Sequence, residues 1–207
     1  MPERRVRAYI GLGANVGDAR TTLTDAVHAL ARLPGARLRG VSRLYATEPV
    51  GVTDQAEFHN AAVALDVPSG PDPETGAFAL LVALKELERR SGRQQRERWG
   101  PRELDLDLLV FGRARLAVER PLDARSIDAA SDPAKASKLL VVPHVEARER
   151  LFVLAPLADL APGLVPPGWG ETVATARSRR EAVEGPGAVR TIGVWDDATG
   201  IWVRSWL

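Results

Sequence analysis

The 207 residues are 45% hydrophobic and 27% charged, which suits one folded domain with room for insertions. The 28 basic and 27 acidic residues nearly balance, so the chain as a whole lacks the basic footprint of a nucleic-acid or membrane-surface binder. The absence of cysteine excludes disulfide frameworks, thiolate metal sites and cysteine nucleophiles. No stretch has the apolar length of a membrane span, and the apolar part of the N-terminus is too short for a secretory signal. We therefore expect a cytoplasmic protein.

Hydrophobic periodicity in the first half of the chain predicts alternating strands and helices. Turn residues separate them, and Asp72 followed by Pro73 is typical of a helix start. The order strand, helix, strand, strand, helix, strand predicts an α+β fold of ferredoxin-like type, with two helices packed on one face of a mainly antiparallel sheet. The expected strands are 6–13, 37–47, 58–67 and 104–111, and the expected helices lie within 19–33 and 73–91.

The second half of the chain carries weaker signals. Residues 113–138 are polar and aperiodic, so we expect a loop excursion there. A short helix and an apolar segment are expected within 143–163. We assign 1–167 to the main domain and 168–207 to a C-terminal extension of unknown role, in which apolar runs on either side of a DDATG turn predict a hairpin.

Two carboxylates interrupt the apolar strand expected at 104–111. Asp105 and Asp107 are two residues apart, so they project from the same face of the strand at a spacing of about 6 to 7 Å. The ordinary explanation is a strand whose outer face meets solvent. The segment 89–102 favours a different one, because it is rich in arginine and glycine and leads directly to this face. Carboxylates that hold magnesium beside guanidiniums that bind phosphate oxygens are the parts of a phosphoryl-transfer site.

Six segments resemble, in order, the 6-hydroxymethyl-7,8-dihydropterin pyrophosphokinase family over about residues 8–162. They are AYIGLGANVGD, SRLYATEPVG, FHNAAVAL, LKELERRSGR, RWGPRELDLDLLVFG and VPHVEARERLFVLAPLADLAP. The resemblance implies transfer of pyrophosphate from ATP to the hydroxymethyl oxygen of the pterin, with release of AMP. It also implies ATP as cosubstrate and two Mg²⁺ ions as cofactors.

The resemblance further implies the residues of the metal, catalytic and nucleotide sites. Asp105 and Asp107 match the magnesium ligands. The catalytic positions are Arg93, Arg96, Trp99 and Arg102, and the nucleotide-binding positions are Glu88, Arg93, Arg102, His144 and Arg150. Gln95 stands where the family often has arginine and the next arginine is Arg96, so the sequence leaves open which residue makes that phosphate contact. For His144, which follows Pro143, a local capping role is the ordinary alternative.

The pterin site is implied in the same way. Phe58 and Phe152 match two aromatic residues that sandwich the flat ring, and Trp99 lies close to the same substrate. Thr47, Asn60 and the backbone around Val50 match the polar contacts to the ring edge. Outside the motif, single phenylalanines would most often be core residues. Gly11, Gly13 and Gly17 are expected to be turn glycines near the site, with Asn15 bracing the pterin loop.

Two other functional classes remain open from the residues alone. An RNA-binding module is one, but aspartates on the outer face would oppose a phosphate backbone. A metal-dependent phosphatase or nuclease is the other, because it also uses carboxylate pairs and arginines. We expect small-molecule partners, no nucleic acid, no membrane and a monomeric protein.

Overall fold

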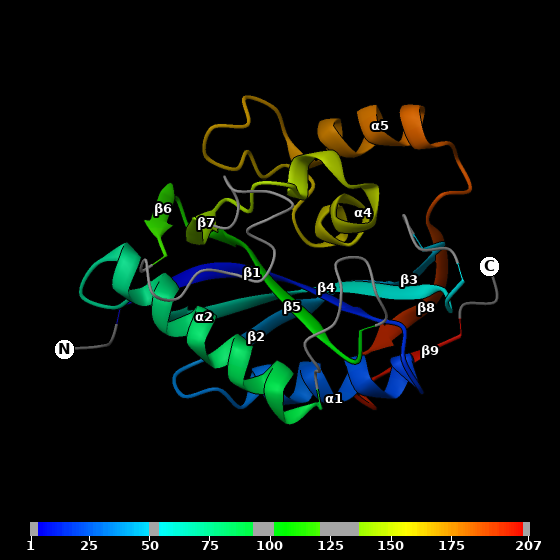
Figure 1. The fold of residues 1–207 in the computed structure, drawn as a ribbon, viewed down its shortest axis with the longest axis horizontal. Helices are drawn as coiled ribbons and strands as arrows, with labels where there is room; N and C mark the ends of the chain where they lie inside the picture. The colour runs from blue at the N-terminus through cyan, green and yellow to red at the C-terminus, as the bar shows by residue number, and fades with distance from the viewer. Residues whose placement is uncertain (1–3, 50–53, 93–101, 121–136, 205–207) are drawn as a thin grey trace.

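The structure is a computed structural model that describes residues 4–49, 54–92, 102–120 and 137–204 (Figure 1). The strands are β1 (Arg5–Ala14), β2 (Arg37–Val41), β3 (Leu44–Thr47), β4 (Phe58–Pro68), β5 (Asp105–Phe111), β6 (Leu116–Glu119), β7 (Lys138–Val142), β8 (Arg190–Asp196) and β9 (Ile201–Val203). The helices are α1 (Ala19–Ala31), α2 (Pro73–Arg90), the short 3₁₀ helix η3 (Ala147–Glu149), α4 (Leu151–Leu160) and α5 (Val173–Glu184).

The main sheet has the strand order β5-β1-β4-β3-β8-β9, and β2 also pairs with β4. Its central ladder joins β1 to β4 in antiparallel register from Arg5↔Pro68 to Ala14↔His59. β5 lies antiparallel on the other side of β1. The predicted α+β fold with a mainly antiparallel sheet is therefore confirmed, and the order of its first strands is that expected for a ferredoxin-like unit.

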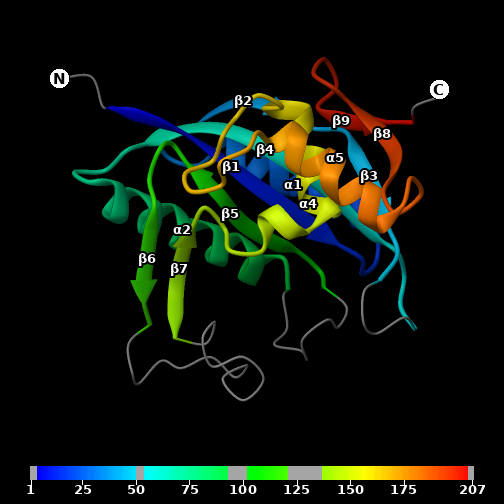
Figure 2. The same cartoon turned by 90° about the horizontal axis from the view of Figure 1, so that it is seen from above.

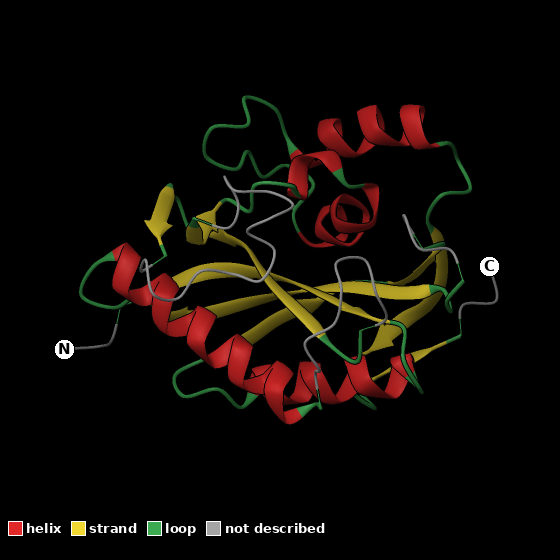
Figure 3. Cartoon of the chain, viewed as in Figure 1, coloured by secondary structure: helices red, strands yellow, loops and turns green. Residues whose placement is uncertain are grey.

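Helices cover both faces of the sheet, as Figures 1 and 3 show. Side chains at alternate positions of β1 divide between the two layers. Ile10 and Leu12 are buried on the face of α1 and α2, whereas Tyr9 packs with Leu154 of α4 on the opposite face. The prediction placed two helices on one face. In the structure α4 and α5 lie over the other face (Figure 1), and α4 supplies Phe152 and Val153 to the pocket that also contains Asp105 and Asp107.

The starts of both long helices follow from local chemistry. Asp18 accepts a hydrogen bond from the backbone N–H of Thr21 at the start of α1, and Asp72 does the same for Thr75 in α2. These carboxylates satisfy N–H groups that have no partner within the helix. Pro73 occupies the first turn of α2, where its missing N–H costs nothing.

The single strand predicted at 37–47 is wrong, because the chain forms β2 and β3 with a break at Ser42. The Ser42 hydroxyl accepts a hydrogen bond from the backbone N–H of Ala62 at 2.8 Å. The Ser42 carbonyl instead accepts from the indole Nε1 of Trp202 at 2.9 Å. Trp202, which is distant in sequence, thus supplies the hydrogen-bond donor for the carbonyl at the break. Hydrophobic periodicity does not reveal such a partner.

The loop predicted over 113–138 is wrong at its two ends. Leu116–Glu119 forms β6, which pairs antiparallel with β7. Leu116 and Val118 pack against the main core, so tertiary contacts stabilise the strand. The sequence of these four residues alone does not predict a strand. Residues 121–136 lie outside the described part of the chain.

The C-terminal extension joins the main sheet. The predicted hairpin is confirmed, since β8 pairs antiparallel with β9 around a turn that contains Gly200. β8 also pairs with β3, and the two views in Figures 1 and 2 place it at that edge of the sheet. The sequence did not predict α5. Among the described helices, none combines the length and apolar character needed to cross a bilayer.

Candidate active site

The two aspartates of β5 lie on one face of the sheet. The register pairs Asp105 with Gly13 and Asp107 with Gly11 of β1. Both carboxylates are partly exposed, whereas Leu106 between them is buried in the core on the opposite face. The arrangement matches the predicted strand geometry and leaves two carboxylates side by side on a surface that a ligand can reach.

A narrow pocket lies over this face, between the sheet and α4. Phe152, from the first turn of α4, covers it. A Cβ at Gly13 would lie 3.5 Å from Oδ1 of Asn60 and 4.0 Å from Cβ of Asp105, so the glycine keeps the floor open. The lining residues are Gly11, Leu12, Gly13, Asn60, Ala61, Asp105, Asp107, Leu109, Phe152 and Val153.

The predicted turn role is wrong for two of the three glycines. Gly11 and Gly13 lie within β1 and line the pocket, where an added Cβ would meet Leu109 at Gly11, and Asn60 and Asp105 at Gly13. Gly17 does lie in the turn before α1, with a φ of +63° that favours glycine.

Arg102 approaches the aspartates from the end of the arginine-rich segment. Its Nη1 donates to Oδ2 of Asp105 at 2.8 Å, and both side chains are partly exposed. The predicted neighbourhood of a guanidinium and a carboxylate is thus present. A phosphate group entering here would meet both a cation and a potential metal ligand.

Asn15 connects Arg102 with the loop before β4. Its Oδ1 accepts from the backbone N–H of Arg102 at 2.8 Å, and its own N–H donates to the Arg102 carbonyl. Its Nδ2 donates to Oε1 of Gln55 and to the carbonyl of Ala56, each at 3.1 Å. The expected bracing of this loop by Asn15 is confirmed, and the same side chain also holds the approach to the aspartates.

Pterin-site candidates gather at the adjoining ends of β3 and β4. Thr47 pairs with Phe58 across the ladder. Asn60 is buried, and its Nδ2 donates to Oγ1 of Thr47 at 2.9 Å. Phe58 and Asn60 are two apart on β4 and share a face of the strand. Asn60 lines the same pocket as Phe152 and both aspartates.

The sequence matches the family model described as 7,8-dihydro-6-hydroxymethylpterin-pyrophosphokinase (HPPK) over residues 9–162. The chain belongs to this family. It is 41% identical over 173 residues to the 2-amino-4-hydroxy-6-hydroxymethyldihydropteridine pyrophosphokinase of Methylorubrum extorquens, covering 84% of this chain and 92% of that protein. The protein of the same name from Bacillus subtilis is 39% identical over 153 residues, covering 74% and 77% of the two chains.

A solved structure supports the HPPK fold. Plasmodium falciparum HPPK-DHPS, crystallised as a triple mutant, superposes with a TM-score of 0.70 at 15% identity. The match covers 98% of this chain and 49% of that one, so the chain spans about half the length of that protein. At this identity the likeness concerns the fold alone.

Glu88, one of the residues expected to bind the nucleotide, is buried between α2 and β5. It is 2% exposed, and its Oε1 accepts from the backbone N–H of Leu106 at 2.7 Å and from Nζ of Lys85 at 2.8 Å. Leu106 lies between the two aspartates, so Glu88 ties β5 to α2. The described contacts show this anchoring function, and a nucleotide contact stays a prediction.

His144 and Arg150 lie around the start of α4. Nδ1 of His144 accepts from the backbone N–H of Glu146 at 3.3 Å, a local bond before η3, and neither η3 nor α4 has a side-chain cap hydrogen bond, so the capping role considered from the sequence is not seen. Arg150 pairs with Glu146, and its guanidinium carbon lies 5.6 Å from the ring centroid of Phe152. Arg150 thus adjoins the pocket, and both nucleotide contacts stay predictions. Four further candidates, Val50, Arg93, Arg96 and Trp99, lie outside the described residues.

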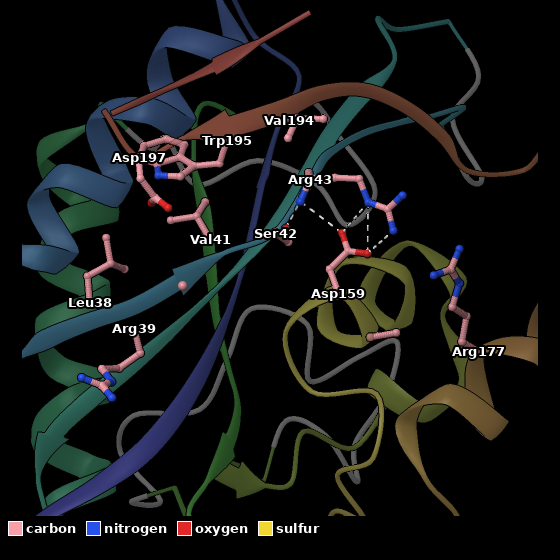
Figure 4. Close-up of a pocket in the computed structure, with 12 residues that line it drawn as sticks. Leu38, Arg39, Val41, Ser42, Arg43, Asp159, Arg177, Val194, Trp195 and Asp197 are labelled. Atoms are coloured by element: carbon pink, nitrogen blue, oxygen red, sulfur yellow. Dashed lines mark hydrogen bonds and ion pairs between the residues drawn. The ribbon is translucent and has the colours of Figure 1, made fainter. Parts of the chain in front are cut away.

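A larger cavity, of about 610 Å³, lies between β2, α4, α5 and the β8–β9 turn (Figure 4). None of the predicted site residues lines it. Its main feature is Asp159, which accepts from the backbone and guanidinium of Arg43 and from the hydroxyl of Tyr45. Burial and the neighbouring Asp159 raise the pKa of the Tyr45 hydroxyl. Asp159 therefore ties β3 to α4, and neither Asp105 nor Asp107 lines this cavity.

Proposed function

We propose that this chain transfers pyrophosphate from ATP to the hydroxymethyl oxygen of 6-hydroxymethyl-7,8-dihydropterin, giving the pterin diphosphate and AMP. One observation carries the proposal: Asp105 and Asp107 share a pocket with Asn60 and Phe152. Candidate metal ligands and candidate pterin contacts thus meet at a single site. Family membership and the names of the relatives support the same reaction.

Mg²⁺ ions, two of them in this proposal, fit the carboxylate pair. Oxygen ligands suit this ion, and magnesium usually combines one or two carboxylates with water and substrate phosphates. Among the described residues, no group of three or more His, Cys, Asp or Glu side chains could form an all-protein metal cage. Asp105 and Asp107 would therefore hold the ions from one side. Bound Mg²⁺ neutralises triphosphate charge and polarises the phosphoryl oxygens.

The protein side chains supply orientation. Arg102 lies where it can bind a phosphate oxygen next to Asp105. Asn60 uses Nδ2 for Thr47, which directs the amide and leaves Oδ1 facing the pocket floor near Gly13. An acceptor in that position suits the N–H groups at the edge of a pterin. The pocket measures about 40 Å³, well below the ~300 Å³ of an ordinary ligand site, so in this proposal the pocket widens when the pterin ring binds.

The deciding experiment is incubation with ATP, Mg²⁺ and the reduced hydroxymethylpterin. We expect AMP and the pterin diphosphate to appear in equal amounts, and neither to appear without Mg²⁺. Release of inorganic phosphate, or cleavage of a polynucleotide, without AMP would support a phosphatase or nuclease instead. Tight RNA binding in the absence of Mg²⁺ would support the RNA-binding alternative.

Three further expectations accompany this function. We propose that residues 1–167 contain the catalytic domain, that the protein acts as a monomer on small molecules, and that it acts in the cytoplasm. The family match to residues 9–162 supports the first of these. Size-exclusion chromatography with light scattering would test the second, and localisation of a tagged protein would test the third.

A further inference from the structure

The C-terminal hairpin borders the strand that carries Thr47. β8 pairs antiparallel with β3, with Leu44 opposite Gly193 and Ala46 opposite Arg190. Thr47 follows Ala46 directly. The family match ends at residue 162, so this neighbour of the pterin-side strand lies beyond the part of the chain that the family match includes.

Beyond the β8–β3 ladder, side-chain hydrogen bonds from Trp202 and Arg20 help to fix the hairpin to the rest of the molecule. Trp202 is 2% exposed and donates from Nε1 to the Ser42 carbonyl. Arg20 of α1 donates to the carbonyls of Ile192 and Trp202, at 2.9 and 3.2 Å. The hairpin is thus anchored to the sheet and to α1, and it offers a fixed support for neighbouring side chains.

Arg190 reaches from this support to the loop before β4. Its Nη2 lies 2.5 Å from Oε1 of Glu57. Glu57 directly precedes Phe58, the first residue of β4 and a candidate for stacking on the pterin. Asn15 holds the preceding two residues of the loop through its Nδ2 group. The segment 55–57 is therefore held by Asn15 from the end of β1 and by Arg190 from β8.

We propose that Arg190 is a positioning residue for the pterin site, acting through its ion pair with Glu57 to fix the start of β4. This inference rests on the proposed pyrophosphokinase function. Substrate contacts held in place before binding lose less conformational freedom when the ligand arrives. Asp105, Asp107 and Arg102 lie on the other side of β1, so the ion pair should affect the pterin more than ATP.

Steady-state kinetics with each substrate varied in turn tests the proposal. Both side chains of the pair are half exposed, so we expect Arg190→Ala to raise the pterin KM by roughly twofold to fivefold. The KM for ATP should stay unchanged. Arg190→Lys should restore most of the loss. Arg190→Glu should raise the pterin KM further, and the exchanged pair Arg190→Glu with Glu57→Arg should reverse that effect.

Arg7→Ala is the matched control. Arg7 forms a cross-strand ion pair with Asp66 at the opposite end of the β1–β4 ladder, with Nε 2.6 Å from Oδ1. This variant should leave both KM values unchanged. An unchanged pterin KM in Arg190→Ala, an equal rise in the ATP KM, or the same change in Arg7→Ala would overturn the positioning role.

Hydrogen exchange gives a readout that does not depend on catalysis. Amides of residues 54–60 should exchange faster in Arg190→Ala than in the wild type, and Arg7→Ala should not change them. If the wild-type protein forms no pterin diphosphate, the proposed function fails, and the exchange data still report whether Arg190 fixes this segment. Unchanged exchange at 54–60 would overturn the inference in either case.

Discussion

At the residue scale, the two β5 aspartates combine partial exposure with a fixed spacing. Asp107 faces Gly11, and Asp105 faces Gly13 while pairing with Arg102. Neither strand neighbour places a side chain over them. The glycines of β1 therefore matter to the site through the space that they leave beside the pocket.

Replacing Asp105 or Asp107 by Asn tests the metal site. Each variant keeps the side-chain shape and removes one charge, so the fold should persist. The Tm of Asp107→Asn should be equal to or above that of the wild type, because repulsion between neighbouring carboxylates is relieved. AMP formation should fall by about a thousandfold or more, because a metal that neutralises developing charge contributes several kcal/mol. The measurement is rate against Mg²⁺ concentration. Near-normal turnover in both variants would show that Asp105 and Asp107 do not bind the metal and only form a solvent-exposed face of the strand.

Replacing Phe152 by Ala tests the pterin site. Phe152 lines the pocket from α4. Its apolar ring is not a metal ligand. Loss of its ring should weaken pterin binding by about 1 to 3 kcal/mol, the usual value for stacking of an aromatic side chain on a heterocycle. Isothermal titration with the pterin and with an ATP analogue separates the two ligands. Equal losses for both would argue against a stacking role.

At the scale of elements, the position of β5 depends on α2. Glu88 accepts the backbone N–H of Leu106, and Lys85 approaches the carbonyl of the same residue at 3.4 Å. Leu106 belongs to a strand at the edge of the sheet, where backbone groups would otherwise lack partners. One turn of α2 thus supplies partners to the backbone of the edge strand at Leu106, between the two aspartates.

The caps of α1 and α2 predict how stability depends on pH. Hydrogen bonds lower the pKa of both capping carboxyls below 3.8, chiefly from the Thr21 hydroxyl for Asp18 and from the Thr75 backbone N–H for Asp72. A lowered folded-state pKa means that the stabilisation is present above the unfolded value and is lost as pH falls through the folded value. Tm should therefore drop as pH is lowered from about 5 to about 2.

The matched variants for this pH dependence are Asp18→Asn and Asp72→Asn. Asparagine still accepts the capping hydrogen bond but does not titrate in this range. The Tm of the double variant should fall less steeply with acid than the wild-type Tm. Parallel curves would show that the caps contribute nothing to acid sensitivity.

At the scale of the whole molecule, the C-terminal hairpin is part of the same core as the family domain. Trp202 is buried with residues of β1, β4 and α1, and its indole meets Trp195 edge to face at a centroid distance of 4.8 Å. The end of the chain therefore stabilises its beginning. A protein cut before β8 would lose both a strand of the main sheet and a large buried side chain.

Trp202→Ala should lower the free energy of unfolding by about 3 to 5 kcal/mol, because it leaves a cavity and removes the partner of the Ser42 carbonyl. Trp202→Phe should lower the free energy of unfolding by less, since the phenylalanine ring fills most of the space of the indole. Urea unfolding followed by circular dichroism and by tryptophan fluorescence measures both. In the wild type the two signals should give one transition. A separate early transition of the hairpin would contradict a shared core.

The sequence by itself determined the antiparallel α+β sheet, the cap of α2, the β8–β9 hairpin and the Asp105–Asp107 face. These features depend on periodicity, turn residues and spacing, which are local properties of the chain. The motifs also indicated Asn60 and Phe152, and the structure brings them to one pocket with the aspartates.

Only the tertiary structure decided the features that depend on residues far apart in sequence. The break at Ser42 requires the indole of Trp202, the strand β6 requires β7 and the core, and the anchoring of Leu106 requires Glu88 from α2. The ion pair of Arg190 with Glu57 spans 133 positions. No local pattern signals such partners, because the packing of elements that are distant in sequence decides which hydrogen-bond donors and acceptors meet.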